Sequence, residues 1–244
     1  MKKHILLFFS LCLFSKVYAQ KFEINADAYS GLFHYGGDGT ATTSYIETGN
    51  PNYTYDPYGN KNGFSYGAGL RLQYVAKSGF IIGAGVDYEI LRSRVDVSVY
   101  QPVYFLPANE DYGSQGFQSL TPPTGHTALQ SQNINISPFI GYRIIAKNIN
   151  IDLMPGIDLG FNINSYDKGS ATDAVNNTYS TNLKLANQPT DVRLRFGAAA
   201  GCGRFGFTAS YAYGLTNLYK TTPMGSNYNA NSELIRFGLS YRIF

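Results

Sequence analysis

The sequence predicts an all-β protein, an eight-stranded antiparallel up-and-down barrel that crosses a membrane with its strands. Only 14% of the 244 residues are charged, while the chain contains 26 glycines and 21 tyrosines. This composition is atypical of a helix-rich cytosolic enzyme or a disordered acidic tail. Apolar residues alternate with small or polar ones along most of the chain, which is the pattern of strands. Short and long connections between these strands also alternate, as they do in transmembrane barrels.

The start of the chain has the features of a signal peptide. Positively charged residues 1–3 precede an apolar segment at residues 5–14, and Ala19 is a small residue before the predicted cleavage site. Ten apolar residues are too few to span about 30 Å of hydrocarbon. We therefore expect an exported protein with a cleaved leader over residues 1–19 and a single barrel domain over residues 20–244.

Removal of this leader changes the charge and cysteine content. Lys2, Lys3 and Lys16 account for 3 of the 19 basic residues, so 16 basic residues remain against 16 acidic ones. A neutral mature chain does not favour nucleic-acid binding. Cys12 is lost with the leader and Cys202 stands alone, which excludes an internal disulfide and a cysteine metal site. We expect no cofactor and no metal.

The alternation is clearest over residues 134–163, where one face is apolar and the other is polar. The same pattern predicts eight strands, at residues 22–35, 64–76, 80–90, 134–146, 149–163, 192–202, 205–215 and 235–243. Three connections are tight, at residues 77–79, 147–148 and 203–204. Four are long, at about residues 36–62, 96–131, 164–190 and 218–232. We expect the tight turns on the periplasmic side and the long loops outside the cell.

A soluble eight-stranded barrel is the competing interpretation. In such a barrel the apolar face points inward, where the space is narrow. Here the apolar face carries the bulky residues, and the opposite face is rich in glycine, alanine and serine. Small residues suit the inside of a narrow barrel and bulky apolar ones suit lipid, so the sequence favours the membrane barrel.

The last strand adds a family resemblance. Residues 234–244 resemble the C-terminal strand of bacterial outer-membrane barrels, which ends in an aromatic residue read by the insertion machinery. The predicted insertion signal comprises Phe237, Leu239, Tyr241, Ile243 and Phe244, although Phe244 is out of phase with the outward set. Together with the leader and the eight-strand layout, the chain is similar to the outer-membrane β-barrel domain family that includes PorT-like proteins. The resemblance implies the outer membrane of a Gram-negative cell, with outer-membrane lipid and the barrel insertion machinery as partners.

The inward face of the predicted barrel contains charges of both signs. The predicted lumen charge network consists of Arg71, Asp87, Glu89, Arg143, Asp152, Asp158, Arg193, Arg195 and Arg236. Glu23, Asp27 and Arg242 complete a set of six arginines and six acids. Charges in a narrow interior persist only when they are paired and hydrogen-bonded. We therefore expect a salt-bridged plug rather than the alternative, a path for protons or ions.

One hairpin allows a sharper prediction. The two-residue turn at residues 147–148 places Arg143 opposite Asp152, with both side chains facing inward. We therefore predict a direct salt bridge between them. Pro138 and Pro155 lack a backbone donor, so we expect a bulge or local break in the ladder near them.

Two further predictions concern the wall. Nine aromatic rings should point outward toward the membrane interfaces, namely those of Tyr74, Phe80, Tyr88, Tyr142, Phe161, Phe205, Phe207, Tyr213 and Tyr241. The inward faces of the sixth and seventh strands carry almost no side-chain volume around Gly197, Gly201 and Gly206. Long arginines or Phe139 must fill this space, or it remains a pocket.

The function we expect is that of a structural or interaction protein of the cell envelope. Loops of this length often carry function, and their tyrosines, among them Tyr53, Tyr55 and Tyr58, suit a protein or glycan partner. The alternatives are a component of a secretion or envelope assembly and a narrow conduit for small apolar molecules. A lipid-modifying enzyme is less favoured, because after cleavage only His34 and His126 remain and no triad is evident.

Overall fold

A computed structural model describes residues 21–98, 103–104, 115–116, 122–219 and 228–244. The predicted leader lies outside these residues, as do Tyr100, Phe105, Tyr112 and Phe117 of the long second connection. No helix among the described residues is long and apolar enough to cross a membrane.

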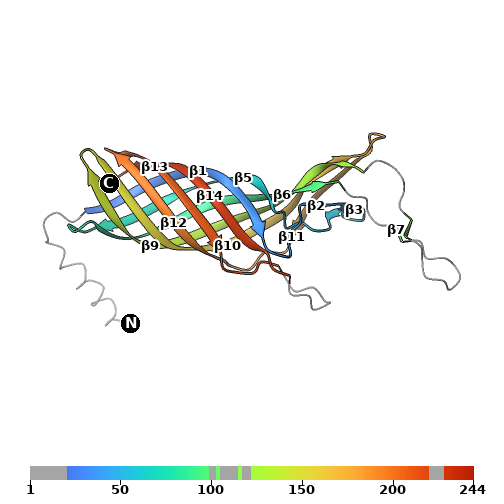
Figure 1. Cartoon of the computed structure of the whole chain (residues 1–244), viewed down its shortest axis with the longest axis horizontal. Helices are drawn as coiled ribbons and strands as arrows, with labels where there is room; N and C mark the ends of the chain where they lie inside the picture. The colour runs from blue at the N-terminus through green and yellow to red at the C-terminus, as the bar shows by residue number, and fades with distance from the viewer. Residues whose placement is uncertain (1–20, 99–102, 105–114, 117–121, 220–227) are drawn as a thin grey trace.

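Eight long strands form a closed ring (Figure 1). They are β1 (Lys21–Gly36), β5 (Lys61–Val75), β6 (Phe80–Val97), β9 (Thr124–Ala146), β10 (Ile149–Thr172), β12 (Asp191–Cys202), β13 (Phe205–Gly214) and β14 (Asn231–Arg242). Each of these strands pairs antiparallel with the next, and β14 pairs with β1. The predicted eight-stranded up-and-down barrel is confirmed.

The tight turns lie together at one end of the barrel, with the C-terminus (Figure 1). Two-residue turns join β9 to β10 and β12 to β13, and residues 76–79 join β5 to β6. Gly79 and Gly203 adopt positive φ values of 89° and 61°, which glycine tolerates without steric cost. The long connections all lie at the opposite end.

The structure corrects the expected outer limits of three strands. β6 continues to Val97, β9 begins at Thr124 and β10 continues to Thr172, so the expected loops at 96–131 and 164–190 are partly strand. A further strand, β11 (Thr178–Leu185), pairs with the end of β10. These segments lie beyond the hydrocarbon of the membrane and need no apolar outer face, so the alternation that revealed the other strands is absent there.

These segments form a projection that we call the external sheet: residues 92–97 of β6, 124–131 of β9, 165–172 of β10, and β11. One face of it is covered by the first long connection, which contains β2 (Thr43–Ser44), β3 (Ile46–Glu47) and β4 (Tyr53–Thr54). β2 pairs parallel with the end of β6, and β3 forms a hairpin with β4. Two more short strands pair with each other, β7 (Val103–Tyr104) and β8 (Gln115–Gly116).

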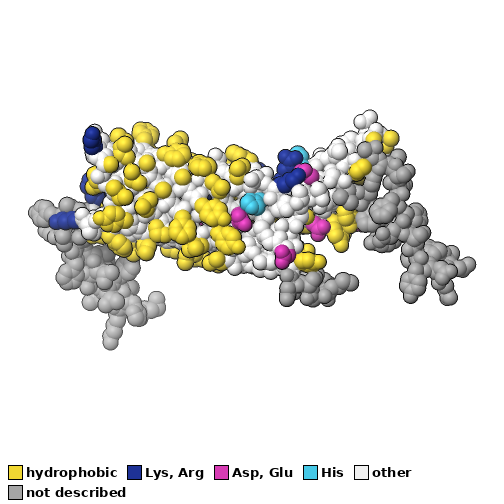
Figure 2. Space-filling model, in the orientation of Figure 1, with side chains coloured by type: hydrophobic (Ala, Val, Ile, Leu, Met, Phe, Trp, Pro, Cys, Tyr) yellow, Lys and Arg dark blue, Asp and Glu magenta, His cyan; other side chains and the backbone are white. Residues whose placement is uncertain are grey.

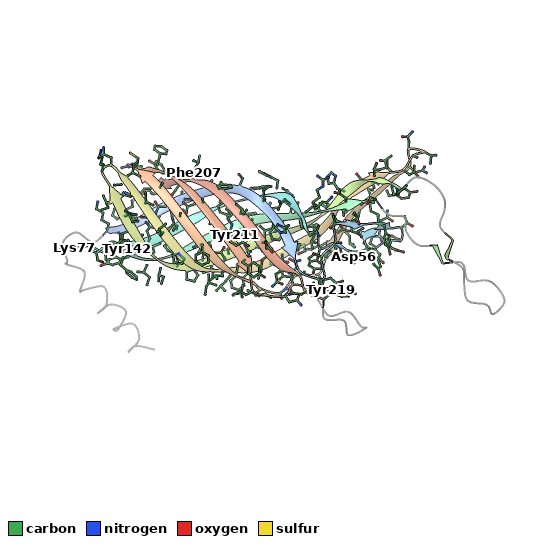
Figure 3. The ribbon with its side chains drawn as sticks, in the orientation of Figure 1. Asp56, Lys77, Tyr142, Phe207, Tyr211 and Tyr219 are labelled. Atoms are coloured by element: carbon green, nitrogen blue, oxygen red, sulfur yellow. The ribbon has the colours of Figure 1, made fainter. Side chains whose placement is uncertain are left out.

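The outer surface of the barrel is apolar. Figure 2 shows hydrophobic side chains over the barrel, with Lys and Arg at its tight-turn end and again where the external sheet begins. Eight of the nine predicted belt rings are exposed, and the ninth, Tyr74, packs on the exposed ring of Phe22 with 5.2 Å between centroids. Figure 3 shows Tyr142 near the tight turns and Tyr219 at the opposite end. The predicted outward orientation of the belt is confirmed.

Val86 tests the lipid-facing assignment, because it lies midway along the apolar face of β6 and is 54% exposed. We expect Val86→Arg to lower the free energy of unfolding in lipid vesicles by about 2–4 kcal/mol, the cost of a cation near the bilayer midplane. Thr178→Arg on the external sheet is the control, with no expected loss. Urea unfolding followed by gel mobility measures both, and equal effects would contradict the assignment.

Candidate functional site

The inward face of the barrel is arranged in layers, which β1 displays in chain order. From the tight-turn end, its inward side chains are Glu23, Asn25, Asp27, Tyr29, Phe33 and Tyr35. Two carboxylates with an amide between them thus come first, a phenol follows, and two buried aromatic rings end the series. The other strands continue these layers around the lumen.

In the layer nearest the tight turns, Arg143 binds two carboxylates. Its Nε donates to Oδ1 of Asp152 at 2.6 Å and its Nη2 to Oδ2 at 2.7 Å. Its Nη1 and Nη2 also donate to Oε1 and Oε2 of Glu23 at 2.8 and 2.7 Å. The amide of Gln73 donates to both acids. Nη1 of Arg242 lies 3.5 Å from Oε1 of Glu23. The predicted Arg143–Asp152 salt bridge is confirmed.

The hairpin has the expected local break at its prolines but no bulge there: the β9–β10 ladder pairs Leu153 with Tyr142 and then Gly156 with Phe139, and it skips the positions of Pro155 and Pro138. The register is the same on both sides of Pro138 and Pro155, with Tyr142 opposite Leu153 and Ile136 opposite Leu159. The shift occurs farther out, between Asn162 and Asn164. The ladder tolerates the loss of a single donor because the flanking pairs keep the strands in register. The bulge instead marks the point where β10 leaves the barrel.

The middle layer contains Arg71 and a small cavity. Arg71 Nε lies 3.2 Å from Oδ2 of Asp27, and its Nη2 donates to Ser240 at 3.1 Å. The cavity has a volume of about 70 Å³ and reaches the thin wall at Gly197. A cavity of this size has room for water molecules, since one water needs roughly 10–15 Å³ of such space.

Long side chains of this wall and of the strands facing it compensate for the predicted lack of side-chain volume. The guanidinium of Arg195 lies over the ring of Phe139, 5.7 Å from its centroid. Arg71 Nη1 contacts the sulfur of Met154 at 3.1 Å. Long side chains thus line the space beside Gly197, and a second cavity of about 30 Å³ borders Gly201 and Gly206.

In the next layer toward the outer mouth, Glu89 accepts hydrogen bonds from two arginines on different strands. Arg193 Nη2 donates to its Oε1 at 2.6 Å and Arg236 Nη2 to its Oε2 at 2.7 Å. Glu89 and Arg193 are fully buried, at 0% exposure. A buried ion pair of this kind persists only with such complete geometry, because each charge has lost its water.

The same layer has a second acceptor, Asp158, which is also fully buried. Arg236 Nη1 donates to it at 2.7 Å, and Arg195 Nε lies 3.1 Å away. Oδ2 of Asp191 lies 2.8 Å from Nε of Arg193, and Asp191 is absent from the predicted network. It is the first residue of β12 and follows a segment expected to be loop, so the alternating pattern of the strand did not include it.

Asp87 is the one predicted network acid whose hydrogen bonds come from neutral donors among the described residues. The hydroxyl of Tyr29 donates to Oδ2 at 2.6 Å and the amide of Asn135 at 2.7 Å. The structure thus places the predicted network residues in one lumen and adds Asp191, Tyr29 and Asn135 to them.

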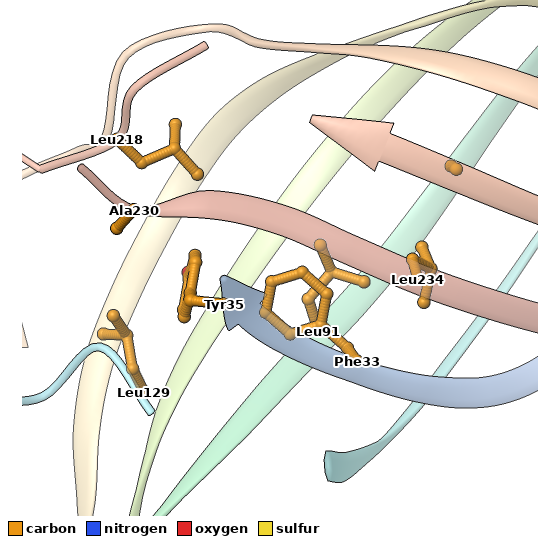
Figure 4. Close-up of a cluster of buried hydrophobic side chains, with 8 residues drawn as sticks. Phe33, Tyr35, Leu91, Leu129, Leu218, Ala230 and Leu234 are labelled. Carbon is orange, nitrogen blue, oxygen red and sulfur yellow. The ribbon is translucent and has the colours of Figure 1, made fainter. Parts of the chain in front are cut away.

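An apolar cluster closes the lumen at its outer mouth (Figure 4). Its buried members are Phe33, Tyr35, Leu91, Leu129, Ala212, Leu218, Ala230 and Leu234. Tyr58 of the first long connection packs edge-on against Tyr35 at 5.1 Å and donates to the carbonyl of Leu218 at 3.0 Å. Sequence reasoning missed this cap because its members occupy inward positions, and the inward face was expected to be polar along its whole length. Bulky apolar residues at inward positions near the outer ends of the strands are the signal that could have revealed it.

The two histidines of the described residues lie apart from the lumen. His34 faces outward, with Nδ1 3.0 Å from Oδ1 of Asn62 and Nε2 3.6 Å from Oε2 of Glu233. His126 lies on the external sheet, opposite Asp96 and Ser170. The described residues contain no group of three or more His, Cys, Asp or Glu placed to hold a metal.

A buried carboxylate attaches the β3–β4 hairpin to the external sheet. Asp167 of β10 accepts from the backbone N–H of Thr54 at 2.5 Å and from its hydroxyl at 2.7 Å. The hydroxyl of Thr181 on β11 donates at 3.1 Å. Burial raises the pKa of Asp167, and the donated hydrogen bonds oppose that rise.

The closed ring of eight strands, its lipid-facing belt and its charged lumen define an integral outer-membrane β-barrel. The chain belongs to the outer membrane protein β-barrel domain family, whose model matches residues 17–220. A search of curated proteins finds no match.

Solved structures similar to this chain include three outer-membrane proteins. Ail, the attachment invasion locus protein of Yersinia pestis, was solved in complex with the heparin analogue sucrose octasulfate. It is 13% identical, with 91% of this chain and 99% of that one covered and a TM-score of 0.32. Neisserial surface protein A is 11% identical, with 91% and 98% covered and a TM-score of 0.34. A major outer membrane protein of Thermus thermophilus is 11% identical, with 90% and 99% covered and a TM-score of 0.36.

Glu89 tests the energetic role of the buried network. We expect Glu89→Gln to lower the free energy of unfolding by about 3–5 kcal/mol, because two guanidiniums lose their shared carboxylate. Glu233→Gln is the matched control at the exposed His34 pair, with an expected loss below about 1 kcal/mol. Urea unfolding in lipid vesicles, followed by tyrosine fluorescence in this tryptophan-free chain, compares the two. Equal losses would contradict the network's role.

The attachment of the β3–β4 hairpin should depend on pH. Because the pKa of Asp167 is raised in the folded protein, its stabilising contribution is complete below the ordinary carboxyl pKa. That contribution is lost as the pH rises through the raised value. We expect the protection factor of the Thr54 amide in hydrogen exchange to be higher in acid than at neutral pH. Asp167→Asn should abolish this dependence; an unchanged dependence would assign it to another group.

Proposed function

We propose that the protein is an interaction protein of the outer-membrane surface, which binds a protein or glycan partner through its external sheet and the connection packed on it. We also propose that residues 1–19 are removed on export. The observation that carries the proposal is the contrast between the two ends of the barrel. The lumen is filled by paired charges and closed by the apolar cap, whereas three strands continue past the cap into the external sheet.

The hairpin packed on the external sheet offers aromatic side chains for recognition. The rings of Tyr45 and Tyr55 are stacked, with centroids 4.8 Å apart and an angle of 16° between planes. Tyr53 is 40% exposed, Tyr55 55%, and Val175 at the β10–β11 turn 63%. Aromatic residues held rigidly at a surface are enriched in interfaces, because they bury large areas at a low cost in entropy.

A narrow conduit for small apolar molecules is the second candidate. An apolar groove of about 550 Å³ on the lipid-facing side shares Met154, Gly197 and Ser210 with the lumen cavity. The β-ladder is nevertheless continuous there, with Gly197 paired to Met154 on one side and Ser210 on the other. The cavity is also far smaller than a typical ligand site of roughly 300–1,000 Å³. These observations favour the interaction protein.

Site-specific photocrosslinking in native cells tests the proposal. We expect a photoreactive amino acid at position 55 or 175 to yield a crosslinked product of one defined mass. The same probe at Phe207, which faces lipid and is 51% exposed, should yield no such product. Absence of a product at both external positions, or the same product from position 207, would contradict a partner at the external sheet. A protein product from the envelope would favour an assembly component.

Planar-bilayer recordings test the closed lumen separately. We expect the purified barrel to show no steady conductance, because the ion pairs and the cap fill the cross-section. Opening a path requires breaking buried pairs at a cost of several kcal/mol. A steady ion current from the wild-type protein would overturn the closed lumen and favour the conduit.

A further inference from the structure

The outward face of β6 changes character at one point. From Phe80 to Ile90 its outward side chains are apolar, and Tyr88 is 43% exposed toward lipid. The next outward residues are Arg92, Arg94 and Asp96. Since a strand rises about 3.3 Å per residue, Arg92 lies only about 7 Å above Ile90. This is where hydrocarbon gives way to lipid headgroups.

Cross-strand register brings other cations to the same face. Arg92 lies opposite Gln130, which lies opposite Tyr166, which lies opposite Lys184. Lys168 is one row farther out, opposite Ala128. Paired residues share a face of a sheet, so these side chains all point outward. The opposite face of β10 and β11 is occupied by the β3–β4 hairpin.

We call this surface the cationic face. It comprises Lys61, Arg92, Arg94, His126, Lys168 and Lys184, and Asp96 is its only acid among the described residues. From β6 to β11 it crosses three strand spacings, about 14 Å. Figure 2 shows its β6 part as a group of basic side chains where the external sheet begins.

Three of these cations have no carboxylate partner among the described residues. Lys61 and Arg94 both pair with Asp96. No carboxylate of the described residues lies within salt-bridge distance of the other three cations, Arg92, Lys168 and Lys184. Two of them are held by rings that orient the charge without neutralising it.

The guanidinium of Arg92 lies 5.2 Å from the centroid of Tyr66, and its Nε donates to Gln130 at 3.0 Å. The ammonium of Lys168 lies 4.6 Å from the centroid of Tyr166. Tyrosine rings at this height settle at the membrane interface, so each ring fixes its cation at the level of the headgroups.

We infer that the cationic face binds the phosphate groups of an outer-leaflet lipid, the phosphorylated saccharide headgroup of lipopolysaccharide. Guanidinium and ammonium groups are the usual protein ligands of phosphate. The apolar side chains of β5 and β6 directly below, among them Tyr66 and Ile90, receive the acyl chains of the same molecule. This continuity of charge with the apolar belt selects a lipid rather than a soluble anion. The site rests on the outer-membrane location and is independent of the partner proposed for the external sheet.

The test uses the full-length mature protein in detergent with purified lipopolysaccharide. The variant Arg92→Gln/Lys168→Gln/Lys184→Gln removes the three available charges and keeps the Lys61–Asp96–Arg94 cluster. The matched control, Lys77→Gln/Lys147→Gln/Arg204→Gln, removes three cations from the tight turns at the other end. Heat-modifiable gel mobility establishes that each variant is folded, and native mass spectrometry at several lipid concentrations measures binding.

We expect the control to bind like the wild type and the cationic-face variant to bind at least about ten-fold more weakly, as the loss of three interfacial charges implies. Enzymatic dephosphorylation of the lipid should weaken binding to the wild type similarly. Equal binding by the two triple variants would overturn the inference, as would undiminished binding of dephosphorylated lipid. Displacement of the lipid by a sulfated polysaccharide at lower concentration than by inorganic phosphate would assign the face to a soluble glycan. Each result leaves the crosslinking experiment at positions 55 and 175 unaffected.

Discussion

The structure depends on the pairing of charges that the narrow barrel takes out of water. Glu89 joins Arg193 of β12 to Arg236 of β14 across the lumen, and Arg143 joins Glu23 of β1 to Asp152 of β10. Each contact to Glu89, and that of Arg143 with Glu23, links strands that are not neighbours in the ring. Closure of the ring brings these charged groups together. Opening the ring would leave buried charges without partners, and this cost in free energy stabilises the closed barrel.

Filling the lumen determines where the protein can act. Ion pairs occupy the cross-section, and the apolar cap closes the outer mouth. Lumen cavities of about 70 and 30 Å³ are too small for a sizeable ligand. The surfaces left for other molecules are the lipid-facing wall and the external sheet. The carboxylate of Asp167, buried among threonine donors, keeps the β3–β4 hairpin on that sheet and so positions Tyr53 and Tyr55.

The outward residues of β6 change with the environment that the strand passes through, from hydrocarbon to lipid headgroups to water. Along β6, outward residues are apolar in hydrocarbon, then Arg92 and Arg94 at the headgroups, then Asp96 in the aqueous extension. The inward residues of the same strand change from Ile81 and two glycines to Asp87 and Glu89, and then to Leu91 of the cap. A strand 18 residues long thus contributes to the belt, the lumen, the cationic face and the external sheet.

The sequence alone determined the barrel, because a strand between lipid and a narrow lumen must alternate large apolar with small or polar residues. Two-residue turns also set register, which is why Arg143–Asp152 was predictable. Only the tertiary structure decided the rest. The covered face of the external sheet carries buried polar residues such as Asp167 and Thr181, so its strands do not alternate apolar with polar side chains. Contacts across the lumen, such as Glu89 with Arg236 or Phe33 with the cap, depend on how the ring closes. Closure of the ring joins residues more than a hundred positions apart in the chain. The local sequence pattern therefore cannot predict these contacts.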